Sequence, residues 1–190
     1  MHDELDKIFN AVPGESSANT RKGRIDITIH SSGAWSYRGT PIERPEMVKL
    51  FASQLICDGG HYYLRAPEQL LRIRVEDLPF LVVQLDIDGD GEQQRPEQQE
   101  LSIVTNCGDK LCVGEAHPLV LLPKASAEFE NAAGASQALP AVLVRDGLYA
   151  RFSRNTYYQL IERAEPATSP GDEAQLFVRS CGIKFPLGQC

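Results

Sequence analysis

The amino-acid sequence predicts an α+β fold in which strands predominate. After residue 60 the chain consists largely of short apolar runs that alternate with polar residues and are separated by turn residues. Apolar residues recur at helical spacing in only a few short segments. One order of elements, a strand, a glycine turn, an aromatic strand and a helix, occurs twice, which indicates two similar β-rich units.

Composition and charge narrow the class of protein. The 190 residues are 42% apolar and 24% charged, which suffices for one large domain or two small ones. The net charge of −7 argues against nucleic acid or an anionic membrane as partner, because both favour a concentrated basic face. The one dense basic run, 21–24, is interpreted as part of a solvated linker.

The first third of the chain is predicted to hold two helices and a hairpin. Apolar residues at helical spacing and alternating isoleucines define the elements, and Pro45 is placed for a first helical turn. The expected elements are a helix over 3–12, a linker to 23, strands over 25–29 and around 35–37, and a helix from 45 that stops at the turn 58–60.

The rest of the chain is expected to form strands and one more helix. The candidate strands are 61–65, 70–75, 80–87, 101–105, 111–114, 119–122, 141–144, 148–152 and 176–179, and the helix spans 155–163. We divide the chain into an N-terminal helix and linker (1–23), a first unit (24–92) and a second unit (93–190). The duplication would place Gly33 on Gly147, Arg44 on Arg154 and Leu50 on Leu160.

Residues 84–100 match the calcium loop of an EF-hand in their letters. The matching residues are Asp86, Asp88, Asp90, Gly91 and Glu97. An EF-hand needs a helix on each side of the loop, whereas both flanks here are rich in strand-forming residues. We therefore predict a hairpin loop and no metal, with calcium-modulated folding as the alternative.

The cysteines and the N-terminus point to a cytoplasmic protein. Five cysteines, without a C-x-x-C pair, suit a reducing compartment. Residues 1–9 lack the basic and apolar regions of a secretory signal, and no apolar run approaches the length of a bilayer. Cys107 and Cys112 are interpreted as small apolar residues, with a redox pair as the alternative.

No catalytic constellation stands out, so we expect a protein that is not an enzyme and needs no cofactor. Serine-hydrolase elbows, P-loops and dinucleotide fingerprints are missing from the sequence. The pair Glu76–Asp77 is interpreted as a solvated strand end, because neighbours on a strand point apart. The alternative is an enzyme of unrecognised type that uses His117 with Glu115 or Asp109 as acid and base.

Three residues near the first hairpin are candidates for ligand binding. Trp35, Tyr37 and Arg44 could form an aromatic and cationic patch for an anionic or peptide ligand. For Trp35 a place in the core is the competing interpretation.

A longer pattern resembles a known family. The stretch from Gly33 to Ser53, G-x-W-x-Y-x-G-x-P-I-x-R-x-x-M-V-x-L-F-A-S, is similar to the signature of a bacterial family called domain of unknown function 1285. The resemblance continues through residues 62–64, 75–80, 105–106, 117–119 and 185–188. It implies an α+β fold of two similar units, each a bent antiparallel sheet with a helix, like pleckstrin-homology folds. It also adds Asn106 and His117 to the candidate binding residues.

The resemblance implies no established activity. We expect a cytoplasmic, non-enzymatic module that binds a protein, a peptide or a small anion, between the units or beside Arg44. A role in signal transduction rests on fold analogy alone. Homodimerisation is a further expectation, because exposed strand edges need to be covered.

Overall fold

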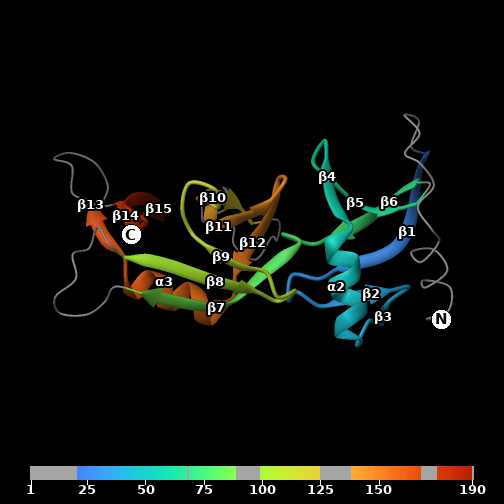
Figure 1. The fold of residues 1–190 in the computed structure, drawn as a ribbon, viewed down its shortest axis with the longest axis horizontal. Coiled ribbons are helices and arrows are strands. Elements are labelled where there is room, and N and C mark those ends of the chain that lie inside the picture. The colour runs from blue at the N-terminus through green and yellow to red at the C-terminus, as the bar shows by residue number, and fades with distance from the viewer. Residues whose placement is uncertain (1–20, 68, 89–98, 125–137, 168–174, 190) are drawn as a thin grey trace, which may run out of the picture. The chain divides into compact units, whose positions relative to one another are not determined.

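The computed structural model describes residues 21–67, 69–88, 99–124, 138–167 and 175–189. The chain separates into two units between Val75 and Glu76 (Figure 1). The predicted helix over 3–12 lies outside the described residues. The predicted boundary at 92/93 would fall within a hairpin of the second unit, since the strands on both sides of it pair with each other.

Unit 1 has a six-stranded sheet and one helix in its described part. Its elements are β1 (Arg21–Ile29), β2 (Trp35–Tyr37), β3 (Thr40–Pro41), α2 (Pro45–Ser53), β4 (Leu55–Asp58), β5 (His61–Ala66) and β6 (Gln69–Val75). The strand order is β3-β2-β1-β6-β5-β4. All neighbours are antiparallel except β1 and β6, which run parallel.

Unit 2 has a six-stranded sheet, a helix and a smaller sheet in its described part. The elements are β7 (Phe80–Asp88), β8 (Glu100–Thr105), β9 (Lys110–Cys112), β10 (Leu119–Pro123), β11 (Ala138–Arg145), β12 (Leu148–Phe152), α3 (Arg154–Glu162), β13 (Glu165–Ala167), β14 (Gln175–Ser180) and β15 (Ile183–Gln189). The larger sheet has the order β10-β11-β12-β7-β8-β9, and the smaller one the order β13-β14-β15. Strands β7 and β12 are the parallel neighbours.

The two larger sheets have the same connectivity. Adding six to each strand number of the first sheet reproduces the order of the second, and the parallel pair β1/β6 corresponds to β7/β12. The duplication predicted from sequence is therefore in the wrong register, because it equates β1 and β2 with β11 and β12. The helices also differ in position: α2 precedes β4, whereas α3 follows β12.

Two further expectations need correction. Each six-stranded sheet is mixed rather than wholly antiparallel, because the first and last of its strands in chain order pair in parallel at its centre. The basic run is no linker, since residues 21–24 form the first half of β1 and pair with residues 69–72 of β6. Lys22 there binds Asp58 at 2.8 Å and lies over the ring of Tyr63.

The core of unit 1 lies under one face of its sheet. Ile27 and Ile29 of β1 alternate with polar residues and are fully buried, as period-two patterning requires. Helix α2 buries Met47 and Phe51, and the Phe51 ring contacts Trp35 with centroids 6.2 Å apart. The opposite face of β1 and β6 is thereby left for polar side chains.

The core of unit 2 contains a buried ion pair. Arg151 of β12 is 6% exposed and binds the Asp77 carboxylate through two nitrogen atoms, at 2.9 and 3.0 Å. It also donates to three backbone carbonyls, of Leu122, Leu139 and Pro123. Asp77 is therefore a core residue and not part of a solvated strand end.

Among the described residues, no helix is long and apolar enough to cross a membrane.

Candidate functional site

The two aromatic candidates belong to the core of unit 1. Trp35 and Tyr37 are 2% and 3% exposed, because β2 lies between β1 and β3 and its Trp35 packs against α2. The indole nitrogen of Trp35 is buried and has no hydrogen-bond acceptor within the described ranges. Both side chains shape the sheet and do not form an exposed patch.

Arg44 is exposed and occupies the N-cap position of α2. Its backbone is extended and its carbonyl accepts from Met47, but its side chain makes no capping hydrogen bond. A cation at a helix N-terminus opposes the helix dipole, so this position does not favour an arginine energetically. Arg44 does not line the cavity described below.

Asn106 and His117 hold unit 2 together. The side-chain oxygen of Asn106 accepts from the backbone N–H of Leu81 at 3.0 Å, and the backbone N–H of Asn106 donates to the Leu81 carbonyl at 2.8 Å. A ring nitrogen of His117 lies 3.1 Å from the Leu143 carbonyl. Both residues thus fasten neighbouring strands.

The proposed acid–base partners of His117 are not in hydrogen-bond contact with it. Asp109 binds Arg145 at 2.9 Å and the Thr105 hydroxyl at 2.7 Å, and Glu115 is exposed. A general base must lie within hydrogen-bond reach of its proton donor, directly or through one water. Among the described residues, no direct hydrogen bond joins His117 to Asp109 or Glu115.

The flanks of the candidate calcium loop are strands, as predicted. Asp86 and Asp88 lie on β7, which pairs antiparallel with β8 so that Asp88 stands opposite Glu100. Asp90 and Glu97 lie outside the described residues. Within the described ranges, no group of three or more histidine, cysteine or acidic residues is placed to hold a metal ion.

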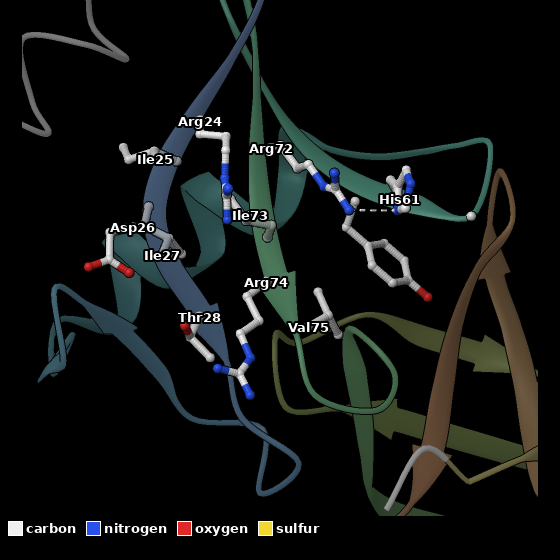
Figure 2. Close-up of a pocket in the computed structure, with 12 residues that line it drawn as sticks. Arg24, Ile25, Asp26, Ile27, Thr28, His61, Arg72, Ile73, Arg74 and Val75 are labelled. Atoms are coloured by element: carbon white, nitrogen blue, oxygen red, sulfur yellow. Dashed lines mark hydrogen bonds between the residues drawn. The ribbon is translucent and has the colours of Figure 1, made fainter.

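The structure reveals a cavity that no predicted site residue lines. It has a volume of about 720 Å³ and lies wholly in unit 1, along β1, β6 and the start of β5 (Figure 2). Side chains on the polar face of the sheet line it, and they include three arginines. The lining residues with polar side chains are Arg24, Asp26, Thr28, His61, Tyr62, Arg72 and Arg74.

The parallel pairing of β1 with β6 brings the arginines together. Arg24 stands directly opposite Arg72, and Thr28 stands opposite Arg74. A register shift in β1 between Arg24 and Thr28 makes four positions along β1 span the same stretch as two along β6. Arg74, two positions beyond Arg72, therefore pairs with Thr28, four positions beyond Arg24. Adjacent strands are about 5 Å apart, so like charges at opposed positions repel and destabilise the sheet.

The arginine cluster, defined as Arg24, Arg72 and Arg74, is poorly neutralised. One nitrogen of Arg72 lies 3.1 Å from a ring nitrogen of His61. Arg24 and Arg74 have no hydrogen-bond or ion-pair partner among the described residues. Asp26 also lines the cavity, but its carboxylate points away from the cluster in Figure 2.

This arrangement suits an anion. Guanidinium groups stay charged at all physiological pH values and present fork-like donors that match carboxylate and phosphate oxygens. Three of them around one cavity give a local excess of positive charge on a chain whose net charge is −7. A bound anion would offset the repulsion between Arg24 and Arg72. It would also supply hydrogen-bond acceptors for the guanidinium groups of Arg24 and Arg74.

Sequence reasoning could recover only part of this cluster. The alternation Arg72-Ile73-Arg74 predicts two arginines on one face of a strand, and this signal was available. Arg24 was assigned to a linker, and nothing in the local pattern shows that β1 and β6 are parallel neighbours.

Comparisons with known proteins place the chain in a family. Two family descriptions match: "Domain of unknown function (DUF1285), N-terminal domain" over residues 13–78, and "Protein of unknown function (DUF1285), C-terminal domain" over residues 79–187. The junction of the two matches lies three residues from the division between the units. No curated protein matches the chain.

Two solved structures resemble the chain. The crystal structure of a DUF1285 family protein from Silicibacter pomeroyi DSS-3 is 33% identical, covers 95% of this chain and 92% of its own, and superposes with a TM-score of 0.74. A DUF1285 family protein from Shewanella baltica OS155 is 25% identical over 72% of this chain and 90% of its own, with a TM-score of 0.49. The chain therefore belongs to the DUF1285 family, as the motif from Gly33 to Ser53 predicted.

Proposed function

We propose that the protein is a non-enzymatic binding module whose unit 1 takes a small anionic ligand in the cavity of the arginine cluster. The observation that carries the proposal is the convergence of three arginines on one cavity, two of them without a partner among the described residues. The volume of about 720 Å³ falls within the usual range for small-molecule sites, roughly 300–1,000 Å³.

The ligand class follows from the geometry of the donors. Arg24 and Arg72 face the cavity from neighbouring strands at one level, and Arg74 stands further along β6 (Figure 2). Two or more anionic groups on one ligand can therefore each meet a guanidinium. A phosphorylated or polycarboxylate small molecule fits this pattern better than a neutral one.

Binding is favoured over catalysis by what surrounds the cluster. The carboxylate of Asp26 points away from it, and a ring nitrogen of His61 lies 3.1 Å from the Arg72 guanidinium. A guanidinium can only donate hydrogen bonds, so Arg72 donates to the His61 ring nitrogen that it contacts. The cavity thus offers groups suited to the recognition of an anion.

The experiment is calorimetric titration of the full chain with pyrophosphate at low ionic strength. The variants Arg24→Gln and Arg74→Gln should each weaken binding about tenfold or more, because a hydrogen bond to a charged group is worth about 1.5–3 kcal/mol. Arg65→Gln is the matched control, since Arg65 is exposed on β5 of the same unit and lies outside the cavity. Loss of heat of binding in the control as well would contradict the site.

Substitution of Arg44 distinguishes this site from the one that the sequence predicts beside Arg44. If the ligand binds beside Arg44, Arg44→Gln abolishes binding while Arg24→Gln leaves it unchanged. The proposed cavity requires the reverse. An absence of binding for pyrophosphate, inorganic phosphate and citrate alike would remove the anion as ligand class.

The remaining expectations attach to this proposal. A cytoplasmic location and a role in signal transduction are consistent with a small-anion sensor, and the likeness to pleckstrin-homology folds stays a prediction. A protein or peptide partner would use acidic side chains to reach the same arginines. Homodimerisation also stays a prediction.

A further inference from the structure

Two thiols from distant parts of unit 2 meet at its surface. Cys112 is the last residue of β9, and Cys181 lies in the turn between β14 and β15. Their sulfur atoms are 3.4 Å apart, and both residues are exposed. The sequence offers Cys107 as a partner for Cys112, but the structure places Cys181 beside Cys112.

The thiols are held together by the hydrogen bonds beside them. The hydroxyl of Ser180 donates to the Val113 carbonyl at 2.6 Å and accepts from the N–H of Leu101 at 2.9 Å. The N–H of Cys181 donates to the Gln99 carbonyl at 2.9 Å. Residues next to both cysteines are therefore fixed to the same part of the sheet, so the contact between the sulfur atoms is built in.

The backbone at Cys181 gives a second, independent observation. Ser180 pairs with Ile183, which leaves Cys181 and Gly182 as a two-residue hairpin turn with φ values of 51° and 75°. Turns with positive φ at both positions select asparagine, aspartate or glycine. A cysteine is strained in this region, so turn formation does not explain its presence.

We propose that Cys112 and Cys181 are a redox modification site that closes to a reversible disulfide. A disulfide needs a sulfur–sulfur distance of about 2.05 Å, so the two atoms must approach by roughly 1.4 Å. Side-chain rotation at the exposed turn can provide this movement. The site lies in unit 2 and is independent of the proposed anion cavity in unit 1.

The oxidant class is a low-molecular-weight disulfide such as oxidised glutathione. The thiolate of Cys181 attacks one glutathione sulfur, which forms a mixed disulfide and releases one glutathione thiolate. Cys112 then attacks the Cys181 sulfur and releases the second glutathione. The two protein thiols lose two electrons and two protons in total, and both are recovered on the two reduced glutathione molecules.

The electrostatic setting assigns the order of these steps. Partial burial and a hydrogen bond with Cys181 raise the pKa of Cys112 to about 11, and Glu100 and Asp88 add to this effect. At neutral pH Cys112 is therefore a thiol and reacts poorly as the first nucleophile. Burial, the largest cause of this rise, also acts on Cys112 in the mixed disulfide, and Cys112 must be a thiolate to attack there. Disulfide closure should therefore accelerate as pH rises from 7 to 9.

The test treats the full chain with a glutathione redox buffer and then alkylates the remaining thiols. Mass spectrometry should show the loss of two hydrogen masses and a cross-linked peptide pair that contains Cys112 and Cys181. Cys112→Ser should stop at the mixed disulfide on Cys181. Cys107→Ser is the matched control, since it removes a nearby thiol and should leave closure unchanged.

A thermal melt provides the second readout. A disulfide here would close the chain between residues 112 and 181 and tie the β14–β15 hairpin to β9, which should raise the midpoint by about 5–10 °C. Mixed disulfides that persist in the wild-type protein would overturn the proposal. A cross-link that joins either residue to another cysteine would do the same.

Discussion

At the scale of single residues, Arg151 shows several polar contacts that converge on one side chain. Its guanidinium is buried and satisfies the Asp77 carboxylate together with three backbone carbonyls. The carbonyls belong to β10 and β11, and Asp77 precedes β7, so one side chain links three strands of the sheet to the segment that enters it. A buried charge of this kind is tolerated because each of its donors has a partner.

Replacement of Arg151 should be among the most destabilising changes in unit 2. Arg151→Met leaves the Asp77 carboxylate buried without a counter-charge, and we expect a loss of about 3–5 kcal/mol in the free energy of unfolding. Urea unfolding followed by circular dichroism measures it. Arg179→Gln is the control: its ion pair with Glu165 is more exposed, so it should cost about 1 kcal/mol or less. Equal losses in the two variants would contradict the role assigned to Arg151.

The raised pKa of Cys112 predicts that the stability of the reduced protein toward unfolding depends on pH. The pKa of its thiol is about 11 in the folded protein, compared with an ordinary value of 9.0 for cysteine. Burial is the main cause of the increase. The contribution of Cys112 is therefore complete below pH 9 and is lost as pH rises through about 11. Wild-type protein should lose more stability between pH 9 and 11 than Cys112→Ser does. The difference between the two melting midpoints, measured in reductant, isolates this group from tyrosines and lysines.

At the scale of elements, the two helices begin in different ways. Helix α3 starts after Ser153, whose hydroxyl accepts from the N–H of Thr156 at 3.3 Å. Helix α2 starts after Arg44, which has the extended backbone of a cap but no capping side chain. The N-terminal turn of α2 is therefore less well satisfied than that of α3.

This difference predicts opposite effects of two substitutions. Ser153→Ala removes a cap and should cost about 1 kcal/mol, whereas Arg44→Ser creates one and should add about 0.5–1 kcal/mol. The second variant also removes a cation from the positive end of the helix dipole. Chemical denaturation of both variants gives the two values. A destabilised Arg44→Ser variant would show that the arginine side chain has a structural role that the hydrogen bonds do not reveal.

Local patterns predicted most elements and missed their long-range pairing. The starts of α2 at Pro45 and of β7 at Phe80 were predicted correctly, because a proline and an apolar run mark them. Residues 55–58 were assigned to the end of a helix, yet they form β4, since the turn at Gly59 and Gly60 pairs them with β5. Tertiary pairing overrode a helical spacing of apolar residues there.

The candidate site failed to emerge from sequence for the same reason. Aromatic and cationic letters near Trp35 and Arg44 suggested a patch, but burial of Trp35 and Tyr37 under the sheet removed its aromatic part. The arginine cluster depends on a parallel contact between strands more than 40 positions apart along the chain. Periodicity describes one strand at a time and carries no information on which strands become neighbours.

At the scale of the whole molecule, the two six-stranded sheets have the same strand connectivity but place their arginine side chains in different environments. Arg72 and Arg74 lie on β6 of unit 1, and the corresponding strand of unit 2, β12, carries Arg151 in its buried ion pair. The same place in the fold thus exposes guanidinium groups in one unit and buries one in the other. A fold does not fix a function, and here it supports a candidate binding face and a structural link in a single chain.

The arginine cluster lies in unit 1 and the cysteine pair lies in unit 2. We therefore expect ligand binding and thiol oxidation to stabilise different units. Trp35 is the sole tryptophan and lies in unit 1, so its fluorescence reports the unfolding of that unit. Pyrophosphate at about 100 times its Kd should stabilise unit 1 by about 2.7 kcal/mol and raise the midpoint of the fluorescence melt. If the two units unfold independently, oxidation of Cys112 and Cys181 should leave this midpoint unchanged and raise the midpoint of unit 2. If both treatments shift both signals equally, the units unfold as one, and ligand binding in unit 1 is coupled to the thiol pair in unit 2.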